Sequence, residues 1–150
     1  MKKRSWTDIA LLPFLLCVGF LRLLGKACGM TYIKISVVFN LWLQGAVLTL
    51  SGLAPAAVTV FKVAHGESVY WWAIVLLLAY AAVYVYGIIW MLRRYRLPFE
   101  DAFWRCVKDL QKLADGWHNT YQIVNLVIFV LLFLVLLGVN IGLTYYITQL

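Results

Sequence analysis

Charge is what this sequence has least of, and the little it has is unevenly placed. Only 13% of the 150 residues are charged, and six are acidic against 13 Lys and Arg. Soluble domains carry about a quarter charged residues, so this chain lacks the polar surface that such a domain needs. Residues 70–92 and 123–147 contain no charged side chain at all. Because about 20 apolar residues cross a bilayer as a helix, the sequence predicts an all-α integral membrane protein.

Cysteines and catalytic motifs are also scarce. The three cysteines, Cys17, Cys28 and Cys106, form no CxxC pair, and their odd number does not indicate a disulfide framework. No nucleophile elbow, phosphate loop or HExxH motif is present. The neighbours His65 and Glu67 lack the further ligands that a zinc site needs. We therefore expect no metal, no cofactor and no enzymatic activity.

Three apolar runs are long enough to span a bilayer, at residues 35–61, 70–92 and 123–147. A fourth run, at residues 8–25, is shorter and is interrupted by Pro13 and Arg22. The run from Ile9 to Leu24, with Pro13 and Arg22 included, would reach roughly 24 Å as a helix, and it lacks the polar face of a helix that lies on a membrane surface. We expect three transmembrane helices and a membrane-embedded N-terminal helix, interfacial or re-entrant, with four transmembrane helices as the alternative.

The distribution of Lys and Arg predicts the orientation. Residues 1–34 carry six of them, residues 93–122 carry another six, and the remaining one is Lys62. If the N-terminal run does not cross, 12 basic residues face one side and one faces the other; if it crosses, the division is nine against four. Basic residues are retained on the cytoplasmic side, so the first arrangement is favoured. It places the N-terminus in the cytoplasm and the C-terminus outside, in a cytoplasmic or inner membrane. A cleaved signal peptide would put residues 93–122 outside, against this rule.

Residues 98–114 show a strong amphipathic pattern. Pro98 and two acidic residues suit the first turn of a helix, and Gly116 suits its end. This cytoplasmic helix could lie on the membrane surface, pack on the N-terminal run or bind a partner protein. Its polar face mixes acidic and basic residues, which argues against nucleic-acid binding. The predicted apolar face consists of Phe99, Phe103, Cys106, Leu110, Leu113 and Trp117.

Uncharged polar residues form stripes along two of the predicted spans. A polar group in hydrocarbon needs a hydrogen-bond partner, so these stripes predict contacts between helices. They could meet within one chain, meet their copies in an oligomer, or line a polar path. The candidate residues are Ser36, Asn40, Gln44 and Ser51 in the first span, and Asn125 and Asn140 in the third.

Small residues form a second set of candidate faces. They are Gly45, Gly52 and Ala56 in the first span, and Gly138 and Gly142, a GxxxG pair, in the third. Such faces let helix backbones approach closely and associate.

Together these features favour a non-catalytic role. We expect a subunit or anchor of a membrane complex, whose helices pack in the lipid bilayer with copies of the chain or with another membrane protein. The alternative is a small homo-oligomeric channel or membrane-perturbing effector, with the polar stripe along its path. No feature of the sequence indicates a nucleic-acid partner.

Overall fold

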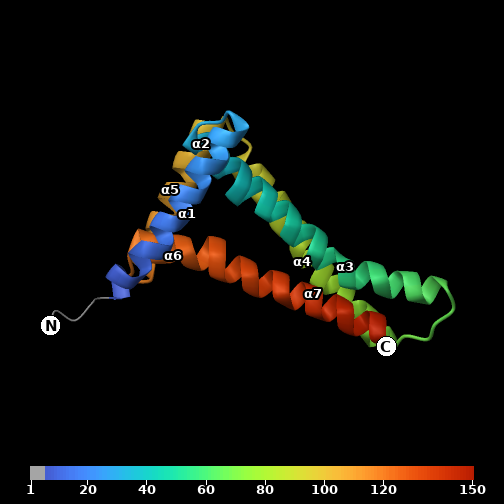
Figure 1. Ribbon diagram of the computed structural model, residues 1–150. Coiled ribbons are helices and arrows are strands. Elements are labelled where there is room, and N and C mark those ends of the chain that lie inside the picture. Colours follow the sequence, from blue (N-terminus) through green and yellow to red (C-terminus); the bar gives the residue numbers. More distant parts are fainter. Residues whose placement is uncertain (1–5) are drawn as a thin grey trace. The chain divides into compact units, whose positions relative to one another are not determined.

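The computed structural model describes residues 6–150, and every regular element in that range is a helix. In chain order these are α1 (Trp6–Cys28), α2 (Tyr32–Ser36), η1 (Val37–Leu43), α3 (Gln44–Ala64), α4 (Trp71–Tyr95), α5 (Phe99–Gly116), α6 (Tyr121–Leu126), η2 (Val127–Leu132) and α7 (Phe133–Gln149) (Figure 1). Four helical stretches are long and apolar enough to cross a membrane: Leu11–Cys28, Tyr32–Ala64, Trp71–Tyr95 and Tyr121–Gln149. The expected all-α class with membrane-length helices is confirmed.

The N-terminal helix is longer than the apolar run at residues 8–25 predicts. It extends from Trp6 to Cys28 and continues through Pro13. Its 23 residues span about 34 Å at roughly 1.5 Å per residue. That length suits a fourth span as well as an embedded helix.

The other helices lie close to their predicted positions. The predicted run 35–61 extends to Tyr32–Ala64, and the third span extends to Tyr121–Gln149. Pro55 lies inside α3 without ending it, although a proline inside a helix removes one backbone hydrogen bond. The amphipathic helix begins and ends within two residues of the predicted range 98–114.

Two of the long helices contain a π-helical segment that the hydrophobic pattern did not predict. Residues Val37–Leu43 form η1, and residues Val127–Leu132 form η2. A π turn widens the helix by one residue and is often found at functional sites. Both segments are therefore candidates for a place near a functional site.

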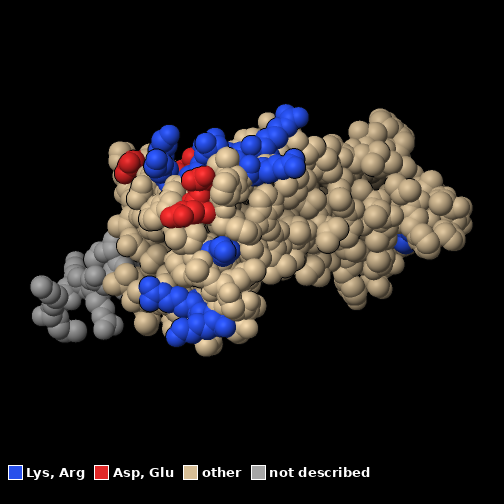
Figure 2. All heavy atoms as spheres, turned by 90° about the horizontal axis from the view of Figure 1, so that it is seen from above, with Lys and Arg blue, Asp and Glu red and all other residues tan. Residues whose placement is uncertain are grey.

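The chain forms two compact units. Unit 1 comprises residues 1–42 and 94–132, and unit 2 comprises residues 43–93 and 133–150. The two units differ in their content of basic residues: eight Lys and Arg lie among the described residues of unit 1, whereas unit 2 holds only Lys62 and Arg93. Figure 2 shows the basic side chains gathered over one part of the visible face, with acidic side chains among them.

Unit 1 is built around contacts of α5 and α6 with the N-terminal elements. Helix α1 packs on α2 and α6, and α5 packs on α2 and α6. The rings of Phe14 and Tyr121 meet edge to face, with centroids 6.2 Å apart, where α1 contacts α6. The small core consists of Leu110, Ala114 and Val124. Exposed large apolar side chains of α1 include Ile9, Leu12, Leu15, Leu16, Phe20 and Leu23. A helix with one packed side and one exposed apolar side suits a lipid environment.

A residue with a positive φ follows the end of both α1 and α5. That residue is a glycine after α1 but not after α5. Gly29 has φ 68°, and the Met30 N–H donates to the Gly25 carbonyl at 2.8 Å. After α5, the residue with positive φ is His118, at 52°, and the Asn119 N–H donates to the Ala114 carbonyl at 2.9 Å. A left-handed residue followed by such a bond closes the last helical turn. Gly116 is thus the last helical residue of α5, and the turn itself is made by His118.

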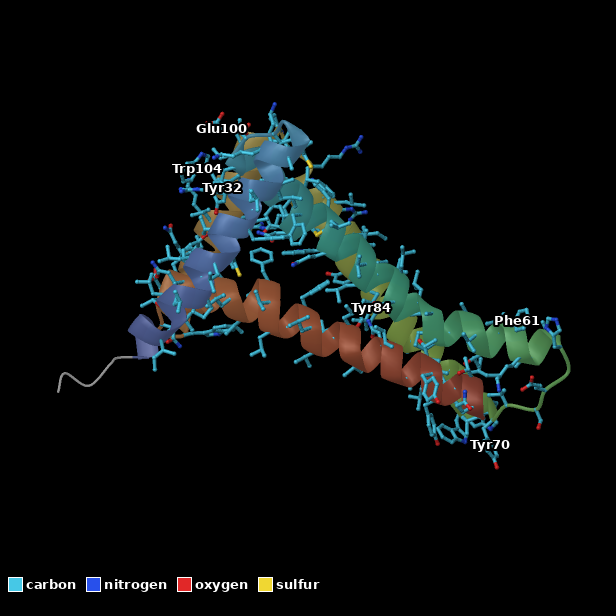
Figure 3. All side chains as sticks on the ribbon, viewed as in Figure 1. Tyr32, Phe61, Tyr70, Tyr84, Glu100 and Trp104 are labelled. Carbon is cyan, nitrogen blue, oxygen red and sulfur yellow. The ribbon has the colours of Figure 1, made fainter. Side chains whose placement is uncertain are left out.

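Unit 2 packs α3 against both α4 and α7. Helix α3 contacts α7 directly, and its glycines face α4. A Cβ atom on Gly45 would lie 2.7 Å from the Met91 Cε, and one on Gly52 would collide with the Tyr84 ring. Tyr84 lies among α3, α4 and α7 in Figure 3. The absence of side chains at these two positions therefore leaves room for the Met91 and Tyr84 side chains of α4 against α3.

Candidate functional site

A cluster of polar side chains in unit 1 surrounds a small cavity beside the π segments. The cavity has a volume of about 40 Å³, and Ser36, Asn40 and Asn125 line it together with Tyr32 and Tyr121. The rest of its wall is apolar or weakly polar, from Val37, Leu41, Phe103, Cys106, Val107, Leu110 and Phe129. Both η1 and η2 contribute to this wall, through Asn40 and Phe129 respectively.

The hydrogen bonds of this first cluster are incomplete. Ser36 is only 5% exposed, and its Oγ has no hydrogen-bond partner in the described part of the chain. Asn125 donates from Nδ2 to the Tyr121 hydroxyl at 3.3 Å, one helical turn away. A water molecule needs roughly 10–15 Å³ of such space, so about three would fit. None of the described lining residues is charged, so the cavity suits water or a small neutral polar molecule.

Unit 2 holds a second polar cluster, centred on Asn140, and here both the nitrogen and the oxygen of the side-chain amide have hydrogen-bond partners. Asn140 is fully buried, and its Nδ2 donates to the Ser51 Oγ at 3.0 Å. The Tyr84 hydroxyl donates to the Asn140 Oδ1 at 3.0 Å, and the Tyr80 hydroxyl donates to the same oxygen. The network therefore joins α3, α4 and α7 through one amide.

The residues of both predicted polar stripes are divided between the two units. Ser36, Asn40 and Asn125 lie at the cavity of unit 1. Ser51 and Asn140 are bonded to each other in unit 2, and Gln44 begins α3 in that unit. Each of the two predicted stripes thus contributes residues to both clusters.

Sequence reasoning missed the tyrosines of both clusters, because tyrosine in a membrane protein usually marks the interface. Tyr80 and Tyr84 lie within α4 and are one helical turn apart. Two tyrosines one turn apart, both far from the ends of a span, are the signal in the sequence that could have indicated a pair of hydroxyl groups inside the bundle. Their hydroxyls lie 3.2 Å apart.

The small-residue faces differ in what they contact. Gly45 and Gly52 lie against side chains of α4, and Ala56 is buried at 7% exposure. Gly138 and Gly142 are exposed, and a Cβ atom on either would meet nothing within 4 Å. The face on α3 is therefore occupied within unit 2, whereas the face on α7 is open.

The apolar face of α5 is largely covered by the chain itself. Leu110 is buried, and Phe103, Cys106 and Leu113 are half-buried, because α5 packs on α2 and α6. The ends of the predicted face remain open: Phe99 is 41% exposed and Trp117 is 48% exposed. The centre of the face is thus covered by helices of the chain other than the N-terminal run at residues 8–25, a packing that the sequence did not predict. The helices that cover it are α2 and α6.

Burial also determines the chemistry of Cys106. It raises the pKa of the thiol to about 12, and the nearby Asp109 carboxylate adds a smaller effect in the same direction. The thiolate is the reactive form of cysteine. At neutral pH Cys106 is therefore protonated, and it serves as a packing residue.

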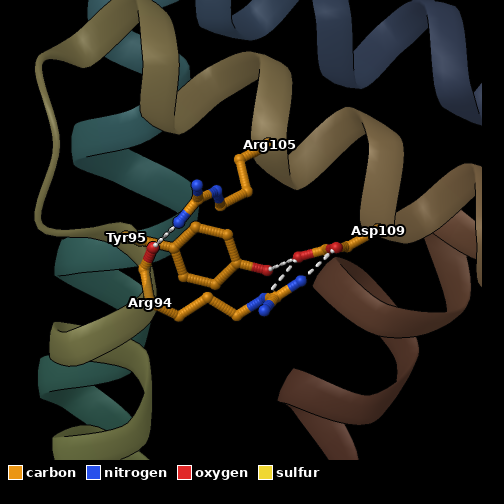
Figure 4. Close-up of polar contacts among 4 residues, drawn as sticks. All are labelled: Arg94, Tyr95, Arg105 and Asp109. Carbon is orange, nitrogen blue, oxygen red and sulfur yellow. Dashed lines mark hydrogen bonds and ion pairs between the residues drawn. The ribbon is translucent and has the colours of Figure 1, made fainter.

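The polar side of α5 is attached to the end of α4 by a three-residue clamp (Figure 4). The Arg94 guanidinium donates two hydrogen bonds to the Asp109 carboxylate, from Nε at 2.7 Å and from Nη2 at 2.5 Å. The Tyr95 hydroxyl donates to the same carboxylate at 2.7 Å. The bonds from Arg94 hold the pKa of the Asp109 carboxyl below its usual value, with a smaller contribution from Tyr95 and against an opposing effect of burial. Arg105 donates from Nη1 to the Arg94 carbonyl at 3.1 Å.

No group of three or more potential metal ligands is found within residues 6–150. His65 and Glu67, in the loop after α3, have local partners. A ring nitrogen of His65 lies 2.9 Å from the Phe61 carbonyl, and Glu67 pairs with Lys62 at 3.1 Å. Their contacts therefore join the loop to the end of α3.

These features define a class: a helical protein with four helices long and apolar enough to span a membrane, two buried polar clusters and a basic unit. No family model, curated protein or solved structure matches the chain.

Proposed function

We propose that this chain is a non-catalytic subunit or anchor of a membrane complex, and that α7 is the helix by which it associates. The observation that carries the proposal is the open GxxxG face. Gly138 and Gly142 lie one turn apart, and both have open space where a side chain would begin. Without a hydrophobic driving force between helices in lipid, small residues that permit close backbone contact favour association. The occupant is a second copy of the chain or another membrane protein.

We also propose three transmembrane helices, with the N-terminus cytoplasmic and the C-terminus outside. The twelve-to-one division of Lys and Arg supports this topology. Reporter fusions at the two ends test it, because three spans place the ends on opposite sides of the membrane. Reporters that respond on the same side would favour four spans, with α1 as the additional one.

The association is tested with the double variant Gly138→Leu/Gly142→Leu. Two leucines would fill the open face and separate the backbones, so the complex seen by native mass spectrometry after gentle extraction should be lost. The matched control is Gly87→Leu on α4. Gly87 is exposed and equally open, but it has no second glycine one turn away.

Loss of the complex in the double variant, with retention in the control, supports the proposal. Wild-type protein that is monomeric and carries no partner would contradict it, as would a double variant that associates normally. Helical content by circular dichroism checks that each variant is folded.

A further inference from the structure

The polar side of α5 forms a basic groove of about 450 Å³ in unit 1. Four cations and two carboxylates line it, which leaves a net charge of two positive units. The charged lining residues are Arg94, Arg105, Lys108, Lys112, Asp101 and Asp109. The volume lies within the roughly 300–1,000 Å³ that is typical of ligand pockets.

The arginines and the lysines of this groove differ in their contacts. Arg94 is held by Asp109, and Arg105 donates to the Arg94 carbonyl at 3.1 Å. These contacts fix one wall of the groove. Lys108 and Lys112 lie one helical turn apart and are both exposed, and neither forms an ion pair with another residue in the described range 6–150. Their ammonium groups are therefore available to an anion.

Apolar side chains line the same groove. Trp104 is 51% exposed and Leu97 is 38% exposed. An exposed indole beside lysines is typical of a surface at the level of lipid headgroups. A soluble anion such as phosphate would make no use of these two apolar side chains.

The position of the groove along the chain supports a lipid ligand. Helix α4 has 25 residues, which reach about 37 Å at roughly 1.5 Å per residue, more than the hydrocarbon core of about 30 Å. Arg94 is the penultimate residue of α4, so the groove begins where a membrane-spanning helix would emerge among the headgroups.

We propose that this groove binds the headgroup of an anionic phospholipid, with its phosphate at Lys108 and Lys112 and its glycerol and first acyl carbons against Trp104 and Leu97. Anionic lipids are attracted to basic groups at the membrane surface, and the apolar rim selects a lipid over a free anion. This inference concerns a surface apart from the α7 face and does not rest on association through it.

The test measures retention of phosphatidylglycerol against phosphatidylcholine on the full chain by native mass spectrometry. The wild-type protein should retain phosphatidylglycerol preferentially. Replacing two lysines at the site should weaken its binding about thirtyfold, so Lys108→Gln/Lys112→Gln should lose the preference. The matched control Lys26→Gln/Lys34→Gln removes the same charge from exposed positions of unit 1 outside the groove, and it should keep the preference.

Three results would overturn the proposal. One is the absence of any preference in the wild-type protein, and another is an equal loss in both double variants, which would indicate general charge attraction. The third is inorganic phosphate displacing the lipid at concentrations at which chloride does not, because a free anion would then be sufficient. A second variant, Trp104→Leu, should weaken lipid binding while leaving the charge unchanged. None of these substitutions touches Gly138 or Gly142, so failure here is distinct from failure of the association.

Discussion

The two polar clusters use similar residue types and reach opposite outcomes. In unit 2, Asn140 is fully buried, and its amide bonds to Ser51 on α3 and to Tyr80 and Tyr84 on α4. In unit 1, Ser36 is almost as deeply buried, but its hydroxyl has no partner in the described chain and faces a cavity of about 40 Å³. Within the described residues, the Asn125 side chain bonds to Tyr121, one turn away on the same stretch of helix.

The difference shows that a polar residue in an apolar helix can have two roles. A polar side chain that is hydrogen-bonded to other helices holds those helices together, because breaking its bonds would leave several polar atoms unpaired in an apolar medium. A polar side chain that faces a cavity without a protein partner makes no such link between helices, and water or a small polar molecule can occupy the space beside it. By this criterion unit 2 is the structural bundle, and unit 1 is the part of the chain with available polar groups.

The largest effect is expected from Asn140→Leu. The change removes three hydrogen bonds between helices, and at roughly 0.6–1 kcal/mol each it should lower the free energy of unfolding by about 2 kcal/mol. Asn125→Leu in the other cluster should cost only about 0.5 kcal/mol, since its bond is local. Denaturant titration in mixed micelles, followed by circular dichroism, measures both. Equal losses would remove the distinction between the clusters.

An intermediate effect is expected at the clamp of unit 1. Because Arg94 lowers the pKa of Asp109 in the folded state, the clamp contributes its full stability above the ordinary aspartate pKa of about 4. That contribution is lost as pH falls through the lowered folded-state pKa. The Arg94 side chain is 39% exposed, so solvent limits the effect to about 1 kcal/mol.

The pH dependence of unfolding in micelles measures this contribution. Asp109→Asn should flatten the profile in the acidic range. The control Asp115→Asn, an exposed position on the same helix, should leave it unchanged. A wild-type profile unchanged by Asp109→Asn would mean that the clamp contributes no net stability.

The smallest effect is expected from paired serine substitutions. Ser51→Ala breaks a bond to Asn140 and should cost about 0.6 kcal/mol. Ser36→Ala removes a buried hydroxyl without a protein partner, so it should be neutral or raise the free energy of unfolding by about 0.5 kcal/mol. The same micelle titration measures both variants. A clear loss from Ser36→Ala would instead show that water in the cavity satisfies the hydroxyl.

The helices themselves could be predicted because their determinants are local. Residues 70–92 and residues 123–147 are each free of charge and long enough to cross a bilayer, so each run predicts a membrane-length helix. The amphipathic period of residues 98–114 predicted α5 to within two residues at each end. The π segments could not be predicted, since their residues are as apolar as the α-helical residues around them and the hydrophobic pattern does not distinguish the two kinds of turn.

The candidate site was predicted only as a set of residues. Asn140 and Ser51 are both candidate residues of the predicted polar stripes, but 89 positions separate them in the chain, and only the packing of α3 on α7 brings them together. No sequence pattern predicts the pairing of Arg94 with Asp109, which depends on how α5 packs against the end of α4. The sequence did not indicate Tyr80 and Tyr84, because their hydroxyls become part of a cluster only through hydrogen bonds to the buried Asn140 side chain on another helix.

The sequence by itself determined that this is a helical protein with membrane-length apolar segments and one strongly amphipathic helix, because hydropathy and periodicity act within single helices. Only the tertiary structure decided which polar groups are satisfied and which glycine face remains open. Those outcomes depend on distances between side chains far apart in the chain, and helix packing, which no single segment encodes, sets those distances.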